Sequence, residues 1–281
     1  MDLLSLKKTV SRLKTQLFKN SNSFSIGMLK SHFKGSGLQF KEHRVYCPGD
    51  DVRFIDWKII AKNNGAYIKT FDEERNVEIV VILDASTTMF SGINNISKLQ
   101  VGIEICSLLY LLAKETNDQV HAIIISDSII SLPKLSGEEG VVALVSTLQK
   151  NNILKENGQV NIHYNHMRDV TFREKASVLM KYLYKKKEVV ILSDFNDFFD
   201  EETLKRIVSK RNIHCFQLVS PLDSAKKLPY LLHCSERTTK KARSGVVHFY
   251  DKDELKGSLG KKIKKLLISE RYLEDFVKEM L

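Results

Sequence analysis

Short apolar runs and longer amphipathic stretches alternate through the middle of this chain. Between residues 77 and 219 the apolar runs are almost continuous, which is typical of strands buried on both faces of a sheet. The stretches between them carry apolar residues at spacings of three and four, which predicts helices. Because strands and helices take turns, we predict an α/β fold with a mostly parallel central sheet covered on both faces. The expected strands are 77–83, 120–125, 128–132, 189–192 and 213–219, and the expected helices are 99–113, 138–149, 172–184 and 201–210.

The flanking segments have a different pattern. Residues 31–75 hold glycines and a proline between short alternating stretches, so we predict a few strands joined by turns. One more strand is expected at 245–250, and amphipathic helices are expected at 3–18 and in the lysine-rich tail 255–281. We expect the strands of both flanks to meet in one small β-rich subdomain, braced by the terminal helices. The predicted division is an N-terminal helical segment at 1–30, a β-rich segment at 31–75, the α/β domain at 76–221, and a C-terminal part at 222–281 whose strands and basic helix pack on the β-rich segment.

Composition narrows the class of protein. Of the 281 residues, 43% are hydrophobic, which is enough for a sizeable core, and the net charge of +10 comes from lysines spread along the whole chain. The four cysteines include no CxxC pair, and the first residues alternate leucine with lysine. No apolar run approaches the ~18 residues that span a bilayer. We therefore expect a cytoplasmic protein without a transmembrane segment, and the basic amphipathic helices leave a peripheral membrane contact open.

Oxygen-bearing side chains follow the first buried strand at every second position. Asp84, Ser86 and Thr88 lie in one short loop there, and Asp194 follows a later buried strand. Ligands of open α/β sheets bind beyond the carboxyl ends of strands, and hard cations such as Mg²⁺ prefer oxygen ligands. One carboxylate and two hydroxyls leave such an ion short of negative charge, so it requires an external carboxylate, and Asp194 can accept hydrogen bonds from metal-bound water. The same short polar residues are also common in turns and helix caps.

A longer motif precedes this region. It reads Arg44-Val45-Tyr46-Cys47-Pro48-Gly49-Asp50-Asp51-Val52-Arg53-Phe54-Ile55-Asp56-Trp57. The motif closely resembles the hallmark Tyr-x-Pro-Gly-Asp-Asp-x-Arg-x-Ile-Asp-Trp of the bacterial domain-of-unknown-function family fifty-eight. In that family the hallmark precedes a von Willebrand factor A-like domain, which is a Rossmann-like α/β fold. The resemblance is strongest over residues 30–90 and extends through Asp194.

The resemblance implies a function for the loop after the first strand. It maps a metal-ion-dependent adhesion site onto Asp84, Ser86 and Thr88, with Asp194 as the later aspartate and Thr171 as the best match to the third element. Such a site takes Mg²⁺, or Mn²⁺ or Ca²⁺, and a carboxylate of a partner completes it. Two residues depart from the family pattern, because Thr88 replaces the usual Ser and Lys62 stands where Arg is usual.

The resemblance also implies partners. Family members are typically encoded beside MoxR-type AAA+ ATPases, and are thought to help them act on client complexes. We therefore expect this chain to bind such an ATPase and a client protein that offers an Asp or Glu. On this reading it is a protein-binding module, not an enzyme.

The hallmark itself has two interpretations. Its residues Gly49, Asp50, Asp51, Arg53, Asp56 and Trp57 either form a recognition surface for a partner or build a structural turn. In the structural interpretation the aspartates cap the turn, Arg53 pairs with a carboxylate and Trp57 is buried. We favour the structural interpretation.

Two other classes of function are weighed against the binding module. The loop at Asp84 is also similar to the nucleophile loop of haloacid dehalogenase-type phosphatases, which read Asp-x-Asp-x-Thr. Ser86 stands in place of the second aspartate, which is the general acid and base, and this argues against catalysis. The net charge suggests nucleic-acid binding, but the basic residues are dispersed and lack accompanying aromatic residues, so we expect no nucleic acid as a partner.

Overall fold

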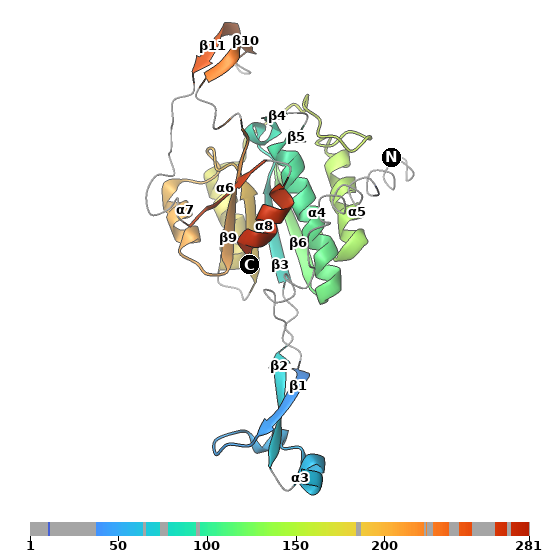
Figure 1. Cartoon of the computed structure of the whole chain (residues 1–281). Helices are drawn as coiled ribbons and strands as arrows, with labels where there is room; N and C mark the ends of the chain where they lie inside the picture. The colour runs from blue at the N-terminus through green and yellow to red at the C-terminus, as the bar shows by residue number, and fades with distance from the viewer. Residues whose placement is uncertain are drawn as a thin grey trace.

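A six-stranded sheet forms the centre of the computed structural model. The structure describes Ser11 and residues 38–63, 66–73, 78–93, 96–183, 187–221, 223, 227–235, 242–248, 262–268 and 271–280. The sheet has the order β12-β9-β8-β3-β6-β7, with all neighbours parallel except β6 and β7, which are antiparallel (Figure 1). The strands are β3 (Glu78–Asp84), β6 (Gln119–Ile125), β7 (Ile129–Ser131), β8 (Glu188–Ser193), β9 (Ile213–Val219) and β12 (Lys264–Leu267). The predicted α/β class with a mostly parallel sheet is confirmed.

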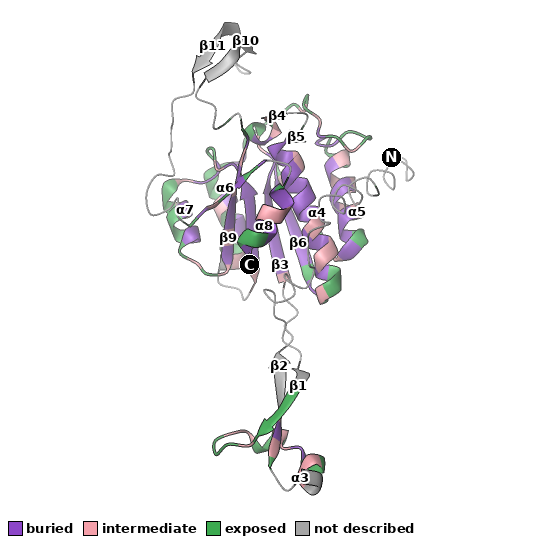
Figure 2. Ribbon diagram, viewed as in Figure 1, coloured by how far each residue is buried: buried purple, intermediate pink, exposed green. Residues whose placement is uncertain are grey.

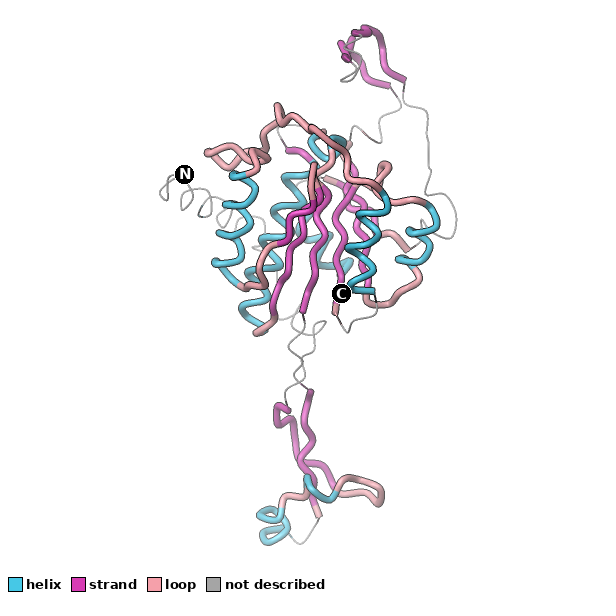
Figure 3. Tube along the Cα trace, turned by 180° about the vertical axis from the view of Figure 1, so that it is seen from behind, coloured by secondary structure: helices cyan, strands magenta, loops and turns pink. Residues whose placement is uncertain are grey.

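Helices cover both faces of this sheet (Figures 1 and 3). Among the described residues these helices are α4 (Lys98–Thr116), α5 (Gly137–Lys150), α6 (Phe172–Leu183), α7 (Glu201–Val208) and α8 (Tyr272–Met280). Alternate residues of β3 enter two separate cores, with Val81 and Leu83 on the side of α4, α5 and α8 and Ile82 on the side of α6 and α7. All of β3 after its first residue is buried, as Figure 2 shows in purple. Burying each such aliphatic side chain contributes roughly 1.5–3 kcal/mol, which explains why these strands read as continuous apolar runs.

The chain order places a switch point beside β3. From β3 the chain runs to β6 on one side, and it later returns to form β8 on the other side. Leu83 of β3 pairs with Leu192 of β8, so the residues that follow these two strands emerge next to each other. Such a point in an open α/β sheet is where ligands bind, at the carboxyl ends of the strands.

The C-terminal residues complete the sheet rather than form one long helix. Residues 264–267 make β12, which pairs in parallel with β9, and α8 follows it. The prediction of a continuous helical tail is therefore wrong in part. The helix α8 packs on the α/β core through Leu273 and Phe276, and the hydroxyl of Tyr272 donates to the buried carboxylate of Glu104 in α4. The expected packing of this part on the β-rich segment is not what the structure shows.

The two flanks form separate hairpins. The strands β1 (Leu38–Val45) and β2 (Tyr67–Glu73) pair with each other, and β10 (Lys227–Ser235) pairs with β11 (Ala242–His248). Each pair is a two-stranded sheet of its own, and Figure 1 draws them at opposite ends of the α/β body. The single β-rich subdomain that we expected from both flanks is therefore not formed by the described residues. The predicted helix at 3–18 lies outside the described residues, apart from Ser11.

Candidate functional site at the carboxyl ends of the strands

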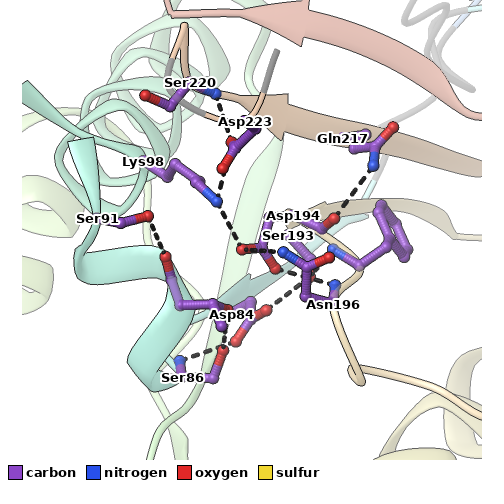
Figure 4. A network of polar contacts seen from close by, with 12 residues as sticks. Asp84, Ser86, Ser91, Lys98, Ser193, Asp194, Asn196, Gln217, Ser220 and Asp223 are labelled. Carbon is purple, nitrogen blue, oxygen red and sulfur yellow. Dashed lines mark hydrogen bonds and ion pairs between the residues drawn. The ribbon is translucent and has the colours of Figure 1, made fainter. Parts of the chain in front are cut away.

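The carboxylate of Asp84 lies at the switch point, where β3 ends (Figure 4). Its Oδ1 accepts a hydrogen bond from the backbone N–H of Ser86 at 2.9 Å, and its Oδ2 accepts one from the hydroxyl of Ser193 at 2.6 Å. Ser193 is the last residue of β8, so this contact joins the ends of the two neighbouring strands. The side chain of Asp84 is fully buried, and its position is fixed from both strands.

Two hydroxyls lie beside this carboxylate. Ser86 precedes the short helix η2 (Thr87–Phe90) without a side-chain capping hydrogen bond, and its Oγ lies 3.4 Å from Oγ1 of Thr88. The hydroxyl of Ser91 donates to the carbonyl of Thr88 at 2.7 Å, which holds the last turn of the loop. Ser86 is half-buried and Thr88 is exposed, so this side of the site is open to solvent. The predicted grouping of Asp84, Ser86 and Thr88 in one loop is thus a feature of the fold.

Burial raises the pKa of Asp84 to about 6. The hydrogen bonds from Ser193 and Ser86 oppose that shift, and the negative charge of Asp194 adds to it. The carboxylate is therefore an anion that its own environment does not fully stabilise. A cation placed next to it would reverse the shift, because an opposite charge within a few ångströms favours the ionised form.

A buried lysine neutralises the second aspartate. Nζ of Lys98, the first residue of α4, lies 2.8 Å from Oδ2 of Asp194 and 3.0 Å from Oδ2 of Asp223 (Figure 4). The side chain of Lys98 is 1% exposed and that of Asp194 is 2% exposed. Asp194 also accepts hydrogen bonds from the backbone N–H and the amide of Asn196, each at 3.0 Å. Its carboxylate is thus occupied by groups of the chain itself.

A second lysine approaches the site from α6. Lys175 is buried, its Nζ lies 4.7 Å from the ring centre of Phe198, and it donates weakly to the carbonyl of Asp197 at 3.4 Å. Burial lowers the pKa of Lys175, and the negative charge of Asp84 opposes that shift. Lys175 therefore adds positive potential on the Asp84 side of the site.

Thr171 has another role in this structure. Its Oγ1 and its backbone N–H both donate to Oε2 of Glu174, at 2.9 Å and 2.8 Å, and its Oγ1 accepts from the N–H of Glu174 at 3.3 Å. This reciprocal arrangement is a capping box at the start of α6. The structure thus uses the Thr171 hydroxyl to start the helix and does not bring it into the Asp84 network.

Two lysines of the site were not predicted from the sequence. The buried Lys98 reads as an ordinary charged residue at a helix start, because its partners come from segments 96 and 125 residues away. Lys175 does carry a signal, since it lies three and four residues before the buried Val178 and Leu179 and so on the apolar face of α6.

The donors available for a metal are a mixture of one carboxylate and hydroxyls. In the described part of the chain, no group of three or more His, Cys, Asp or Glu side chains has a geometry that holds a metal ion. A cation at this edge of the sheet therefore depends on the hydroxyls of Ser86 and Thr88 together with Asp84. Hard cations accept this set and keep waters in their remaining positions.

The hallmark forms a turn that its aspartates hold together. Oδ2 of Asp50 accepts from the N–H of Cys47 at 2.8 Å, and Gly49 between them has a φ of +106°, which favours glycine. Asp50 also pairs with Arg44 at 2.5 Å. Asp51 caps the helix η1 (Val52–Phe54) through the N–H of Arg53 and binds the guanidinium of the same residue at 2.6 Å.

Asp56 is the most enclosed hallmark residue. Its carboxylate accepts from the N–H of Lys58 in helix α3 (Trp57–Asn63) at 3.0 Å and contacts His43 at 3.0 Å and Lys69 at 3.2 Å. The hydrogen bond from His43 is the main reason that the pKa of Asp56 falls to about 2. Asp56 therefore ties α3 to both strands of the hairpin. These contacts agree with the structural interpretation of the hallmark.

The expected burial of the hallmark tryptophan is wrong, because Trp57 is 69% exposed. Among the hairpin side chains whose burial the structure describes, only those of Asp56 and Ile68 are buried, so there is little core there to receive an indole. Trp57 is the only tryptophan of the chain, so its fluorescence reports on this position alone. We expect an emission maximum close to that of free tryptophan in water, ready quenching by acrylamide, and little red shift on unfolding in guanidinium. A blue-shifted emission protected from acrylamide in the purified chain would contradict the exposed position.

A family model described as "Protein of unknown function DUF58" matches residues 42–234, more than half of the chain. The chain belongs to this family. The match begins in the hallmark hairpin and includes Asp84 and Asp194, which are the two carboxylates of the site. Membership of the family confirms the resemblance seen in the sequence, and the six-stranded topology confirms the predicted α/β class.

Curated relatives of this DUF58 chain are uncharacterized. The uncharacterized proteins Mb1516 of Mycobacterium bovis and Rv1480 of Mycobacterium tuberculosis are each 23% identical over 115 residues, which is 41% of this chain. The match spans 36% of the length of each relative. The names of these relatives assign no activity.

Two solved structures similar to part of this chain come from bacteria. BatB from Bacteroides thetaiotaomicron has a TM-score of 0.43 at 12% identity, covering 73% of this chain and 97% of its own. A von Willebrand factor type A protein from Catenulispora acidiphila has a TM-score of 0.25 at 10% identity, covering 67% of this chain and 38% of its own.

The expected cytoplasmic location is contradicted by another of these comparisons. An aerotolerance-related membrane protein from Bacteroides fragilis has a TM-score of 0.42 at 12% identity, covering 73% of this chain and 98% of its own. Separately, none of the helices among the described residues combines the length and apolar character required to cross a bilayer.

Proposed function

We propose that this DUF58 protein is a metal-dependent protein-binding module. Asp84, Ser86 and Thr88 would hold one Mg²⁺ ion, or Mn²⁺ or Ca²⁺, and a carboxylate of a partner would complete its shell. The observation that carries the proposal is the buried carboxylate of Asp84, which lies at the switch point beside two accessible hydroxyls. When bound, the ion would supply the positive charge that attracts the partner.

The donor set supports a hard cation. Each oxygen of Asp84 accepts one hydrogen bond from the chain and keeps a second lone pair, so neither bond prevents coordination. The 3.4 Å between the hydroxyl oxygens of Ser86 and Thr88 is compatible with two neighbouring positions around one ion after a small adjustment. Thr88 is exposed, which leaves an approach for the partner.

Binding rather than catalysis is favoured by the side chain at position 86. A phosphatase that used Asp84 as a nucleophile would require a second carboxylate there as general acid and base, and Ser86 cannot exchange protons in that way at neutral pH. The family resemblance suggests a MoxR-type AAA+ ATPase and a client with an accessible Asp or Glu as partners. The ATPase would be the first protein to test.

Calorimetric titration with Mn²⁺ tests the metal site. We expect one ion to bind the wild-type chain, and we expect Asp84→Ala and Ser86→Ala to reduce the affinity at least tenfold, because each removes a ligand. Thr87→Val is the matched control, since this exposed residue lies in the same loop and offers no oxygen to the proposed site. Equal Mn²⁺ affinity in Asp84→Ala and in wild type would refute the metal site.

A binding assay tests whether the chain binds its partner through the metal site. The wild-type chain should bind the MoxR-type ATPase or its client in Mg²⁺ and release it in EDTA. Asp84→Ala should fail to bind in either buffer while it keeps its circular dichroism spectrum. Undiminished binding by the folded Asp84→Ala variant would contradict the proposed function.

A further inference from the structure

The polar network contains one cation for which the proposed function gives no role. Lys98 is almost completely buried, and its ammonium group lies between Asp194 and Asp223. Burying a charged lysine is costly unless it is paired, and here two carboxylates pair with Lys98. Its backbone N–H also donates to the carbonyl of Ser91 at 3.0 Å, which ties the start of α4 to the loop after η2.

Asp194 is close enough to Asp84 to affect it. The negative charge of Asp194 raises the pKa of Asp84, and the preceding residue Ser193 donates directly to the Asp84 carboxylate. An ion bound at Asp84 would therefore feel the charge of Asp194 as well. If Asp194 had no lysine partner, the carboxylates of Asp84 and Asp194 would together balance the two positive charges of the ion. The ion would then not require a carboxylate from a partner protein.

We propose that Lys98 is the fixed counter-ion of Asp194, and that it leaves a cation at the neighbouring metal site with unbalanced positive charge for a partner's carboxylate. This inference rests on the proposed metal site. Paired with Lys98, Asp194 adds little net charge beside the ion. Asp223, the second partner of Lys98, is 36% exposed, so solvent screens its charge and Asp84 is the main carboxylate that compensates the ion. Lys175 adds further positive potential from the α6 side. Lys98 is thus a positioning residue that makes the site dependent on its partner.

The proposal predicts opposite effects for the two members of the pair. Removing the ammonium group in Lys98→Met leaves Asp194 free to attract the ion, so Mn²⁺ should bind the purified chain on the order of tenfold more tightly. Removing the carboxylate charge in Asp194→Asn leaves Lys98 with less compensation, so Mn²⁺ should bind on the order of tenfold more weakly. The double variant Lys98→Met/Asp194→Asn should return close to the wild-type affinity.

Asp223→Asn is the control for general disturbance of the network. Asp223 also contacts Lys98, but its side chain is 36% exposed and its Oδ2 is held by the N–H of Ser220 at 2.7 Å. We expect its effect on Mn²⁺ affinity to be much smaller than that of Asp194→Asn. A purely structural role for Lys98 would lower the melting temperature of both single variants, but it would not move their Mn²⁺ affinities in opposite directions.

The experiment is a calorimetric Mn²⁺ titration of the five full-length proteins, with thermal melting as a check on folding. Unchanged or weaker Mn²⁺ binding by folded Lys98→Met would overturn the inference and leave the metal site intact. Absence of Mn²⁺ binding to the wild type would remove both the metal site and the inference. If Lys98→Met does not fold, the comparison of Asp194→Asn with the double variant decides, because the double variant should bind more tightly and equal affinities would overturn the inference.

Discussion

Replacing Asp84 with asparagine is expected to stabilise the metal-free protein at pH 8 by about 2–3 kcal/mol. Burial raises the pKa of this carboxyl from its ordinary 3.8 to about 6. The folded state therefore holds the proton more tightly than the unfolded state does, and the stability of the wild type falls as the pH rises from about 4 to about 6. Above that window the full cost of the buried charge is present, and asparagine does not carry it.

The geometry allows asparagine at this position. Its Oδ1 can accept from the N–H of Ser86, and its Nδ2 can donate to the hydroxyl of Ser193, so neither contact is lost. Urea unfolding from pH 4 to pH 8 checks the prediction. The two proteins should converge near pH 4, where the wild-type carboxyl is protonated, and separate as the pH rises. Lower stability of the asparagine variant at pH 8 without divalent ions would contradict it.

Divalent ions should reduce or reverse the difference in stability between the asparagine variant and the wild type. An ion that binds only the folded wild type adds about 2.7 kcal/mol when it is present at one hundred times its dissociation constant. The asparagine variant should gain much less, because the charge that holds the ion is gone. The Asp84 carboxylate would thus lower the stability of the metal-free protein and raise that of the metal-bound protein, as expected for a group that binds a cation.

Gly140→Ala is expected to lower the free energy of unfolding by roughly 2 kcal/mol, although alanine favours helices. Gly140 lies in α5 where this helix crosses α4, and a Cβ at that position would lie 2.0 Å from Cδ1 and 2.6 Å from Cγ of Tyr110. The ring of Tyr110 is fully buried and cannot rotate away from the contact. The two helices must separate, and the core between them loses contacts.

Thermal unfolding of four variants, Gly140→Ala, Gly102→Ala, Tyr110→Leu and the double variant Gly140→Ala/Tyr110→Leu, tests this explanation. In Gly102→Ala the new Cβ would meet the end of the flexible Leu83 side chain at 2.6 Å, so we expect a smaller loss than at Gly140. Adding Tyr110→Leu to Gly140→Ala should cost less than the sum of the two single changes, because the smaller side chain makes room for the methyl group. Additive losses would show that the ring is not the obstacle.

Periodicity predicted β3, β6 and β8 well because these strands are buried on both faces. The runs at 77–83, 120–125 and 189–192 correspond to β3, β6 and β8 within one or two residues at their ends. The loop that brings Asp84 to Ser86 and Thr88 was predictable for the same reason, since it follows directly from the end of a buried strand. Local sequence is sufficient to predict an element where its local pattern and its burial in the fold agree.

The remaining features depend on contacts between distant parts of the chain. Ile263, Leu266 and Leu267 have the spacing of a helix, yet pairing with the edge of β9 makes this segment a strand. The ion pair of Lys98 with Asp194 joins α4 to the end of β8, and no local pattern reports it. The structural interpretation of the hallmark placed Trp57 inside, but few of the described side chains of its hairpin are buried.

The strand β12 has a practical consequence for fragments of this protein. The family match ends at residue 234, whereas β12 and α8 lie beyond it. A fragment cut at the end of the match would leave the backbone of β9 with an open edge and would strip Phe276 from the ring of Phe216, which it meets at 4.8 Å between centres. Open strand edges recruit other strands, so such a fragment would self-associate, and expression boundaries should be drawn past α8.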